Sequence, residues 1–221
     1  MEKRSVTFGT YVTSVNNWTV SKIELSSPEY QSNMIQVPGR NGFLDLSTAL
    51  TDGHPVYNSR YLTVVLENSD GDRSERESRI RKIISELDGY ERSIRLPDTS
   101  GYYLKGRLRV IRNYNDMAHA SVTVTAVCEP LMYSGTQKEY SVTASSSEKT
   151  VTIVNEGRMP VIPTIENTAS NVSITFNGIT QVFSTASRWV WSEMVLVPGS
   201  NTVKYSGSGT IKFSFTEAFL L

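Results

Sequence analysis

The sequence is poor in the residues that most often carry metal chemistry and nucleophilic catalysis. Its 221 residues include one cysteine, Cys128, and two histidines, His54 and His119. A single cysteine excludes a disulfide within the chain and argues against a cysteine-based zinc site. Both histidines stand beside turn residues or a strand end, where imidazoles are usually solvated. We expect neither histidine to be catalytic, and we expect Cys128 to be a small buried side chain rather than a nucleophile.

Charge of one sign and long apolar runs are also missing. Lys and Arg number 22, Asp and Glu number 22, and the formal net charge is zero. The chain therefore lacks the positive field of a nonspecific nucleic-acid-binding protein. No apolar run approaches the roughly 20 residues of a membrane-spanning helix, and residues 1–17 lack the apolar segment of a secretory signal. We expect no specific nucleic-acid recognition and no membrane insertion.

The charged residues are unevenly distributed along the chain. Residues 1–130 carry 32 of the 44 charged side chains, and residues 131–221 carry the other 12. Such a shift indicates two domains with different surfaces. The intervening stretch CEPLMYSGTQKEY contains Pro130 and Gly135, which interrupt regular structure. We expect an N-terminal domain over 1–133 and a C-terminal domain over 134–221.

The first domain reads as strands, one helix and strands again. In 79–87, isoleucines and leucines recur at the i, i+3, i+4, i+7 spacing of an amphipathic helix. Ser74 and Glu77 have the spacing of a capping box, and Asp72 is a second candidate N-cap. Segments rich in β-branched or alternating apolar residues predict strands at 18–25, 60–68, 107–112 and 121–127. This order indicates a small α+β domain rather than a repeating βαβ unit.

The second domain reads almost entirely as β-structure. Short strands separated by turn residues are predicted at 150–155, 171–178, 193–197, 201–205 and 210–215. Several short strands at such spacing are typical of a β-sandwich or a jelly roll. The fold class predicted for the whole chain is therefore mainly β, in two domains.

Motifs for catalysis or cofactor binding are absent. The sequence has no Walker A loop, no GxGxxG, no HExxH and no GxSxG. Paired carboxylates of a glycosidase could come from the aspartates that stand beside turn residues, where turn hydrogen bonding is the more common role; these are Asp45, Asp52, Asp98 and Asp116. We expect no enzyme activity, no cofactor and no metal site. Trp189 and Trp191 alternate in SRWVWSE, and they are either core or partner-interface residues or a platform for stacking on sugar rings.

Three ordered segments resemble the signature of siphophage distal tail (Dit) proteins. The segment 37–68 is similar to that family's "PGRDG-x-LDLT-x-AL" stretch followed by "Y-x-NR-x-L", and 79–110 is similar to its helix followed by an "LPDD-x-x-YYY-x-GR" stretch. The C-terminal segment, PGSNTVKYSGSGTIKFSFTEAFL, is similar to the family's final strand pair and terminal "F-R-E-x-x-L". The chain departs from these patterns at Asn41, Ser59 and Thr216.

The resemblance implies a fold and a role. It implies a C-terminal galectin-like β-sandwich and an N-terminal hexamerisation domain of β-sandwich character with one flanking α-helix. It implies that the N-terminal domain forms a ring and meets the tail tube. It implies that the partners are five further copies of the chain, the tail tube protein, a tail-associated fibre or lysin protein, and a receptor-binding protein. The location implied is the virion tail tip, after assembly in the cytoplasm of the bacterial host.

A ring requires one patch of the chain to meet a different patch on its neighbour. We expect the loop 38–45 and the strand 60–66 to contribute, with the arginines as charged anchors because arginine makes planar bidentate pairs. The residues proposed for this interface are Pro38, Gly39, Arg40, Asp45, Arg60 and Tyr61. An alternative for Arg40 is a salt bridge within its own domain. The alternative function is a non-catalytic carbohydrate-binding module that contacts the host cell wall through Trp189 and Trp191.

Overall fold

The computed structural model describes residues 4–51, 55–114 and 119–221. The chain is mainly β and contains one helix in this described part, which confirms the predicted fold class. It divides into two compact units between Met132 and Tyr133, with Leu220 returning to the first unit. No helix among the described residues is long and apolar enough to cross a membrane.

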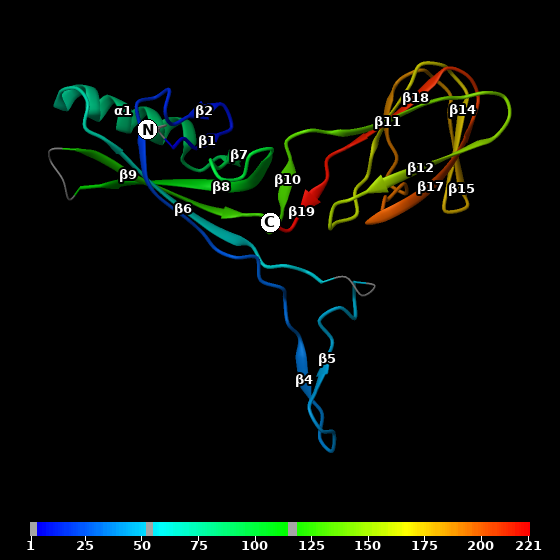
Figure 1. Cartoon of the computed structure of the whole chain (residues 1–221), viewed down its shortest axis with the longest axis horizontal. Coiled ribbons are helices and arrows are strands. Elements are labelled where there is room, and N and C mark those ends of the chain that lie inside the picture. Colours follow the sequence, from blue (N-terminus) through cyan, green and yellow to red (C-terminus); the bar gives the residue numbers. More distant parts are fainter. Residues whose placement is uncertain (1–3, 52–54, 115–118) are drawn as a thin grey trace. The chain divides into compact units, whose positions relative to one another are not determined.

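The first unit is built on one antiparallel sheet (Figure 1). Its strands follow the order β2-β1-β7-β8-β9-β6-β3. Their bounds are Tyr11–Val12 (β2), Thr7–Phe8 (β1), Glu91–Arg95 (β7), Tyr102–Asn113 (β8), Ala120–Cys128 (β9), Arg60–Asn68 (β6) and Thr19–Leu25 (β3). The strands predicted at 60–68 and 121–127 are present as β6 and β9, and every second residue of each strand is buried. Their inward residues form the core together with those of β8.

The helix α1, Arg73–Leu87, lies along one face of this sheet (Figure 1). It buries Ile80, Ile83 and Leu87, as the spacing of its apolar residues predicts. The capping box expected at Ser74 and Glu77 is wrong. The N-cap is Asp72, whose side chain accepts the Glu75 N–H at 2.9 Å, while the Glu75 carboxylate accepts the Asp72 N–H at 3.3 Å. The helix begins at Arg73, so Ser74 lies inside its first turn and Glu77 is left available for another partner.

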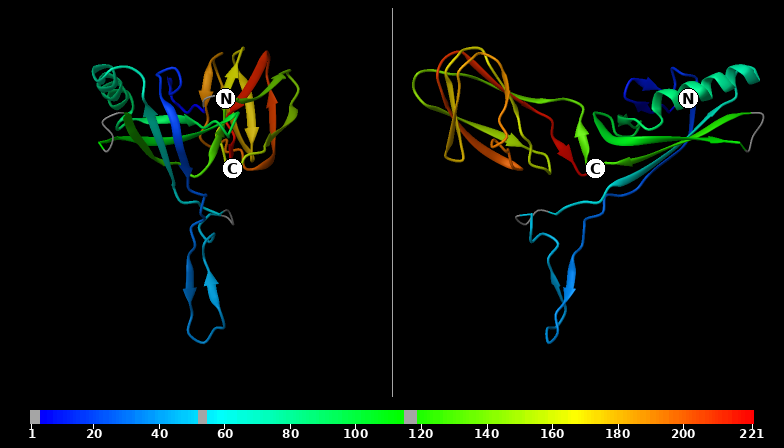
Figure 2. Two further views of the ribbon diagram at one scale, coloured as in Figure 1. Left: turned by 60° about the vertical axis from the view of Figure 1, so that its left-hand side comes forward. Right: turned by 180° about the vertical axis from the view of Figure 1, so that it is seen from behind.

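A separate hairpin leaves the first unit's sheet between β3 and β6. Its strands are β4, Met34–Gln36, and β5, Phe43–Asp45, which pair only with each other within the described chain. Both are visible as the isolated two-stranded ribbon in Figures 1 and 2.

The second unit is a β-sandwich of two four-stranded antiparallel sheets, and the views in Figure 2 show the layers. One sheet has the order β11-β18-β13-β16: Lys138–Thr143, Thr210–Phe215, Thr164–Asn167 and Arg188–Val190. The other has the order β12-β17-β14-β15: Lys149–Asn155, Gly199–Ser206, Val172–Phe176 and Ile179–Phe183. Inward side chains of both sheets share one core. Two further short strands, β10 (Met132–Ser134) and β19 (Ala218–Phe219), pair with each other where the chain enters and leaves this unit.

One predicted strand of the second unit is wrong. Residues 193–197 form no strand, and only Leu196 makes an isolated bridge, to Val161. Met194 and Leu196 are nevertheless fully buried. Their alternation therefore reflects burial in an irregular segment that packs on the core, which the period of two cannot distinguish from a strand.

Candidate functional site

The hairpin β4–β5 exposes apolar side chains that no part of the described chain covers. Phe43 is 63% exposed and Leu50, which follows the hairpin, is 98% exposed. Met34 and Ile35 on β4 are also exposed, and none of these residues belongs to either core cluster. A two-stranded hairpin is marginal in water by itself. An apolar surface on such a hairpin is typical of a protein–protein contact.

Hydrogen bonds at the base of the hairpin hold its two arms together. The Leu46 N–H donates to the Asn33 carbonyl at 2.8 Å, and the Asn33 N–H donates to the Ser47 hydroxyl at 2.8 Å. The Ser47 N–H in turn donates to Asp45 Oδ1 at 2.9 Å. Hydrogen bonds from Ser47 lower the pKa of Asp45. Asp45 is exposed and works here as the carboxylate of an Asx turn.

The turn at the tip of the hairpin carries one charged side chain, Arg40. Pro38, Gly39 and Arg40 are all exposed. Gly39 has φ +80° and Gly42 has φ +78°, in the left-handed region that glycine adopts without strain. The Arg40 N–H donates to the Val37 carbonyl at 3.2 Å, and its guanidinium makes no ion pair among the described residues. The Arg40 charge is therefore available to a partner.

Arg60 is buried, unlike the rest of the proposed interface. It is 4% exposed, and its Nε donates to the Ser26 carbonyl at 2.8 Å. Desolvation lowers the pKa of its guanidinium. The neighbouring Tyr61 is exposed, and its N–H donates to the Ser26 hydroxyl at 2.8 Å. Arg60 thus joins the two chain segments at the point where they leave the sheet toward the hairpin. Of Arg60 and Tyr61, only Tyr61 has a side chain that is exposed to a partner.

The described residues that were considered for catalysis lie in separate segments of the chain. His54, Asp52 and Asp116 lie outside the described residues. Asp98 is exposed in a turn after β7. His119 borders a surface cavity of about 410 Å³ whose charged lining is mainly arginine. Its one carboxylate among the described lining residues, Glu77, is held by Arg112.

Cys128 is a packing residue. Its side chain is buried in the first core, and burial raises the pKa of its thiol to about 11. A thiol with that pKa stays protonated near neutral pH and is a poor nucleophile.

The two tryptophans belong to the core of the second unit. Trp191 is 8% exposed, and its N–H donates to the Glu193 carboxylate at 3.1 Å. Trp189 is partly buried, and its N–H donates to Asn167 Oδ1 at 3.1 Å. Both rings pack against Phe183, with centroids 5.6 and 6.5 Å away. These contacts use the rings for packing, whereas stacking on a sugar requires an open aromatic face.

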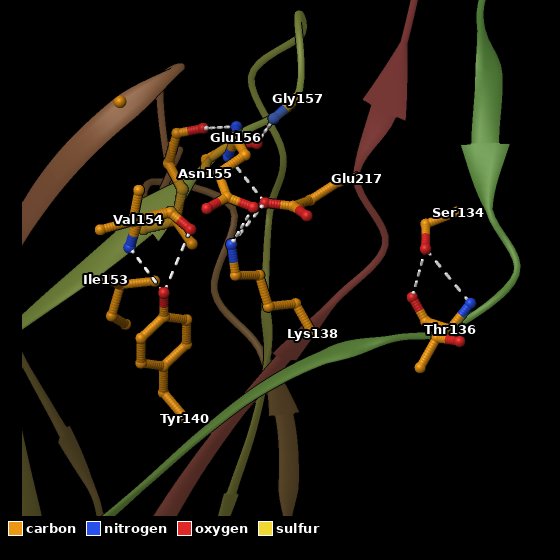
Figure 3. A network of polar contacts seen from close by, with 12 residues as sticks. Ser134, Thr136, Lys138, Tyr140, Ile153, Val154, Asn155, Glu156, Gly157 and Glu217 are labelled. Carbon is orange, nitrogen blue, oxygen red and sulfur yellow. Dashed lines mark hydrogen bonds and ion pairs between the residues drawn. The ribbon is translucent and has the colours of Figure 1, made fainter. Parts of the chain in front are cut away.

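A polar network joins the end of β12 to the segments that bound the second unit (Figure 3). Lys138 Nζ donates to Glu156 Oε2 at 2.9 Å and to Glu217 Oε1 at 3.1 Å. The buried Glu217 carboxylate also accepts the Glu156 N–H at 2.6 Å. Desolvation lowers the pKa of Lys138, but its hydrogen bonds to Glu156 and Glu217 together outweigh this effect. The net result is a raised pKa. Sequence reasoning missed this network, and its only signal was Glu217 in the terminal motif.

Comparison with known proteins identifies the fold. No family model and no curated protein matches the sequence. Among solved structures, the SPP1 Dit (gp 19.1) protein matches 97% of this chain and 99% of its own length, with a TM-score of 0.68 and 15% identity. That structure is described as a paradigm of the hub adsorption apparatus in phages that infect Gram-positive bacteria.

The chain has the fold of SPP1 Dit. Two structures of the phage P2 baseplate in its activated conformation, with Ca and with Sr, match with a TM-score of 0.51 and 9% identity. Each match covers 97–98% of this chain and 98% of the baseplate chain. The likeness therefore spans both units, as the three-segment resemblance to Dit proteins implies.

Proposed function

We propose that this chain is a structural hub protein of a phage tail tip. Its copies, six in number, form a ring that joins the tail tube to tail-associated fibre or lysin proteins and to receptor-binding proteins. The observation that carries this proposal is the match to SPP1 Dit over the full length of both chains. The P2 baseplate matches support the same role, since they also cover nearly the whole chain.

The ring contact in this proposal uses the hairpin β4–β5. A closed ring needs two different complementary patches on each copy. The uncovered apolar side chains of the hairpin supply one patch, and burying them against a neighbouring copy is favourable by roughly 25 cal/mol per Å² of apolar surface. Arg40 supplies a charged anchor at the tip, while Asp45 and the buried Arg60 hold the hairpin in shape. The second patch lies on the neighbour's first unit and includes Tyr61.

The hub works by binding and not by catalysis in this proposal. The first unit supplies the ring and meets the tail tube, and the second unit presents its outer surfaces to the adsorption proteins. Cys128, a candidate nucleophile in the sequence, supports this proposal because it is buried in the first core.

Sedimentation of the full chain tests the ring. We expect a species of six times the chain mass for the natural sequence. Phe43→Lys places a charge on the uncovered hairpin, and we expect it to reduce the assembly to smaller species without changing the melting temperature. Val15→Lys is the matched control, because Val15 is an exposed apolar residue of the first unit outside the hairpin.

Arg40→Glu should weaken the ring, whereas Arg158→Glu, at an exposed site in the second unit, should not. An unchanged mass for both hairpin variants would contradict the proposed contact.

A further inference from the structure

The strand β15 is an open edge of the second unit. It pairs with β14 on one side and has no strand on its other side within the described chain. An open edge offers unpaired N–H and C=O groups to any extended segment. Proteins usually protect such edges with charged side chains, proline, bulges or a very short strand.

The other edge strands of more than three residues carry charge. β3 bears Lys22 and Glu24, β11 begins with Lys138 and Glu139, and β12 begins with Lys149. β3 also has a register shift near its start. By contrast, β15 has neither charge nor proline, and its register with β14 is unbroken over its whole length.

The surroundings of β15 are also free of charge. The sequence carries no charged residue between Glu166 and Arg188. On β15, Ile179 is 49% exposed and Val182 is 54% exposed. A strand added to this edge would cover apolar side chains without desolvating any charge of β14 or β15, so the partner that fits is itself an uncharged extended strand.

We propose that β15 pairs with β15 of a second copy, antiparallel, about a two-fold axis at Gln181. In this register Ile179 lies opposite Phe183, Thr180 lies opposite Val182, and Gln181 lies opposite its own copy. Directly opposed residues share a face of the sheet. The side chains of each pair are also similar in character. The first pair is apolar, the second is β-branched, and the third consists of two amides.

The pairing has a defined symmetry and strength. It joins two four-stranded sheets into a continuous one and closes at two copies, because the same patch serves on both sides. A ring contact instead joins two different patches. This inference therefore goes beyond the proposed hub and does not depend on the hairpin. One short strand buries less than the roughly 800 Å² per partner of a typical stable complex. The dimer is accordingly weak for single chains and is strengthened where many copies are held together.

Sedimentation in a Phe43→Lys background tests the pairing apart from the ring. We expect concentration-dependent association to persist in this background. Adding Val182→Lys places a charge on the edge strand, and we expect it to weaken the association at least tenfold. Adding Thr152→Lys is the matched control, because Thr152 is exposed on β12 of the same sheet, and it should leave the association unchanged. The proposal would be overturned if the Phe43→Lys chain stayed monomeric at every concentration. It would also be overturned if that chain and its two double variants associated equally.

Cross-linking tests the register. Opposed Cα atoms of an antiparallel pair lie about 4.5–5.5 Å apart, within the range that a disulfide spans. Gln181→Cys should therefore give a covalent dimer on mild oxidation with diamide, since Gln181 is exposed and meets its own copy. Thr152→Cys should give at least fivefold less covalent dimer. The chain without an introduced cysteine should give none, because its one cysteine, Cys128, is buried. Equal yields from the two introduced cysteines would overturn the two-fold register.

Discussion

At the scale of single residues, close approach between strands explains one glycine of the Dit-like motif. Gly106 on β8 pairs with Cys128 on β9. A Cβ at position 106 would lie 2.8 Å from Cys128 Sγ and 2.9 Å from the Val127 carbonyl oxygen. Real Cβ atoms do not come so close, so any side chain here must push the two strands apart.

Gly106→Ala should destabilise the first unit by about 1–3 kcal/mol, the usual cost of overpacking. Urea unfolding followed by circular dichroism measures this change. Ser93→Ala on the neighbouring β7 serves as the control, with an expected effect within about 0.5 kcal/mol. Combining Gly106→Ala with Cys128→Ala should restore little, because the Val127 carbonyl remains in the way. Full stability of Gly106→Ala would show that the strands can separate without cost.

At the scale of elements, an ion pair fastens the helix to the sheet. Glu77 on α1 accepts two hydrogen bonds from the Arg112 guanidinium on β8, one of them at 2.7 Å. The Tyr114 ring packs on the same guanidinium, 4.7 Å from its centroid. Hydrogen bonding to Arg112 lowers the pKa of Glu77, and the same bonds raise the pKa of Arg112.

The lowered pKa of Glu77 predicts a pH-dependent contribution to stability. A carboxylate whose pKa is lower in the folded state stabilises it fully above the unfolded pKa, and this stabilisation is lost as the pH falls through the folded value. Glu77→Gln should therefore lower the urea midpoint at pH 7, and the difference from the natural chain should shrink as the pH falls below the ordinary value of 4.5. Glu86→Gln, in an exposed pair with Lys82, should show a smaller difference at every pH. A Glu77→Gln effect that is independent of pH would argue against the ion pair as its cause.

At the scale of the whole molecule, the chain enters and leaves the second unit at one polar network. Lys138 lies just after the entry and Glu217 just before the exit, and both meet Glu156 at the end of β12. Lys138 begins β11 and Glu217 follows β18 in one sheet, whereas Glu156 follows β12 of the other sheet. The network therefore joins the entering and leaving segments to the opposite layer of the sandwich.

Glu217→Ala should destabilise the second unit by about 2 kcal/mol, because the Glu156 N–H loses its acceptor and Lys138 keeps only one carboxylate. Hydrogen exchange measured by peptide mass spectrometry should show faster exchange in 138–156 and 210–219. Peptides from 60–68 in the first unit should not change. Glu156→Ala, at a more exposed position, should have a smaller effect. Equal acceleration in both units would contradict a role confined to the second.

The sequence by itself determined the elements whose signal is local. The buried face of α1 and the strand β9 follow from periodicity within a few residues, and β6 follows from its β-branched and aromatic composition. The many short strand segments indicate a mainly β chain. The tertiary structure decided what depends on pairing between distant segments. It placed Arg60 in the core beside Cys128, left β15 at an edge, gave Glu77 to Arg112, and buried Met194 and Leu196 without a strand. The physical reason is that a side-chain pattern reports which face is buried, whereas strand neighbours, edges and ion-pair partners are set by which segments meet across the sheet.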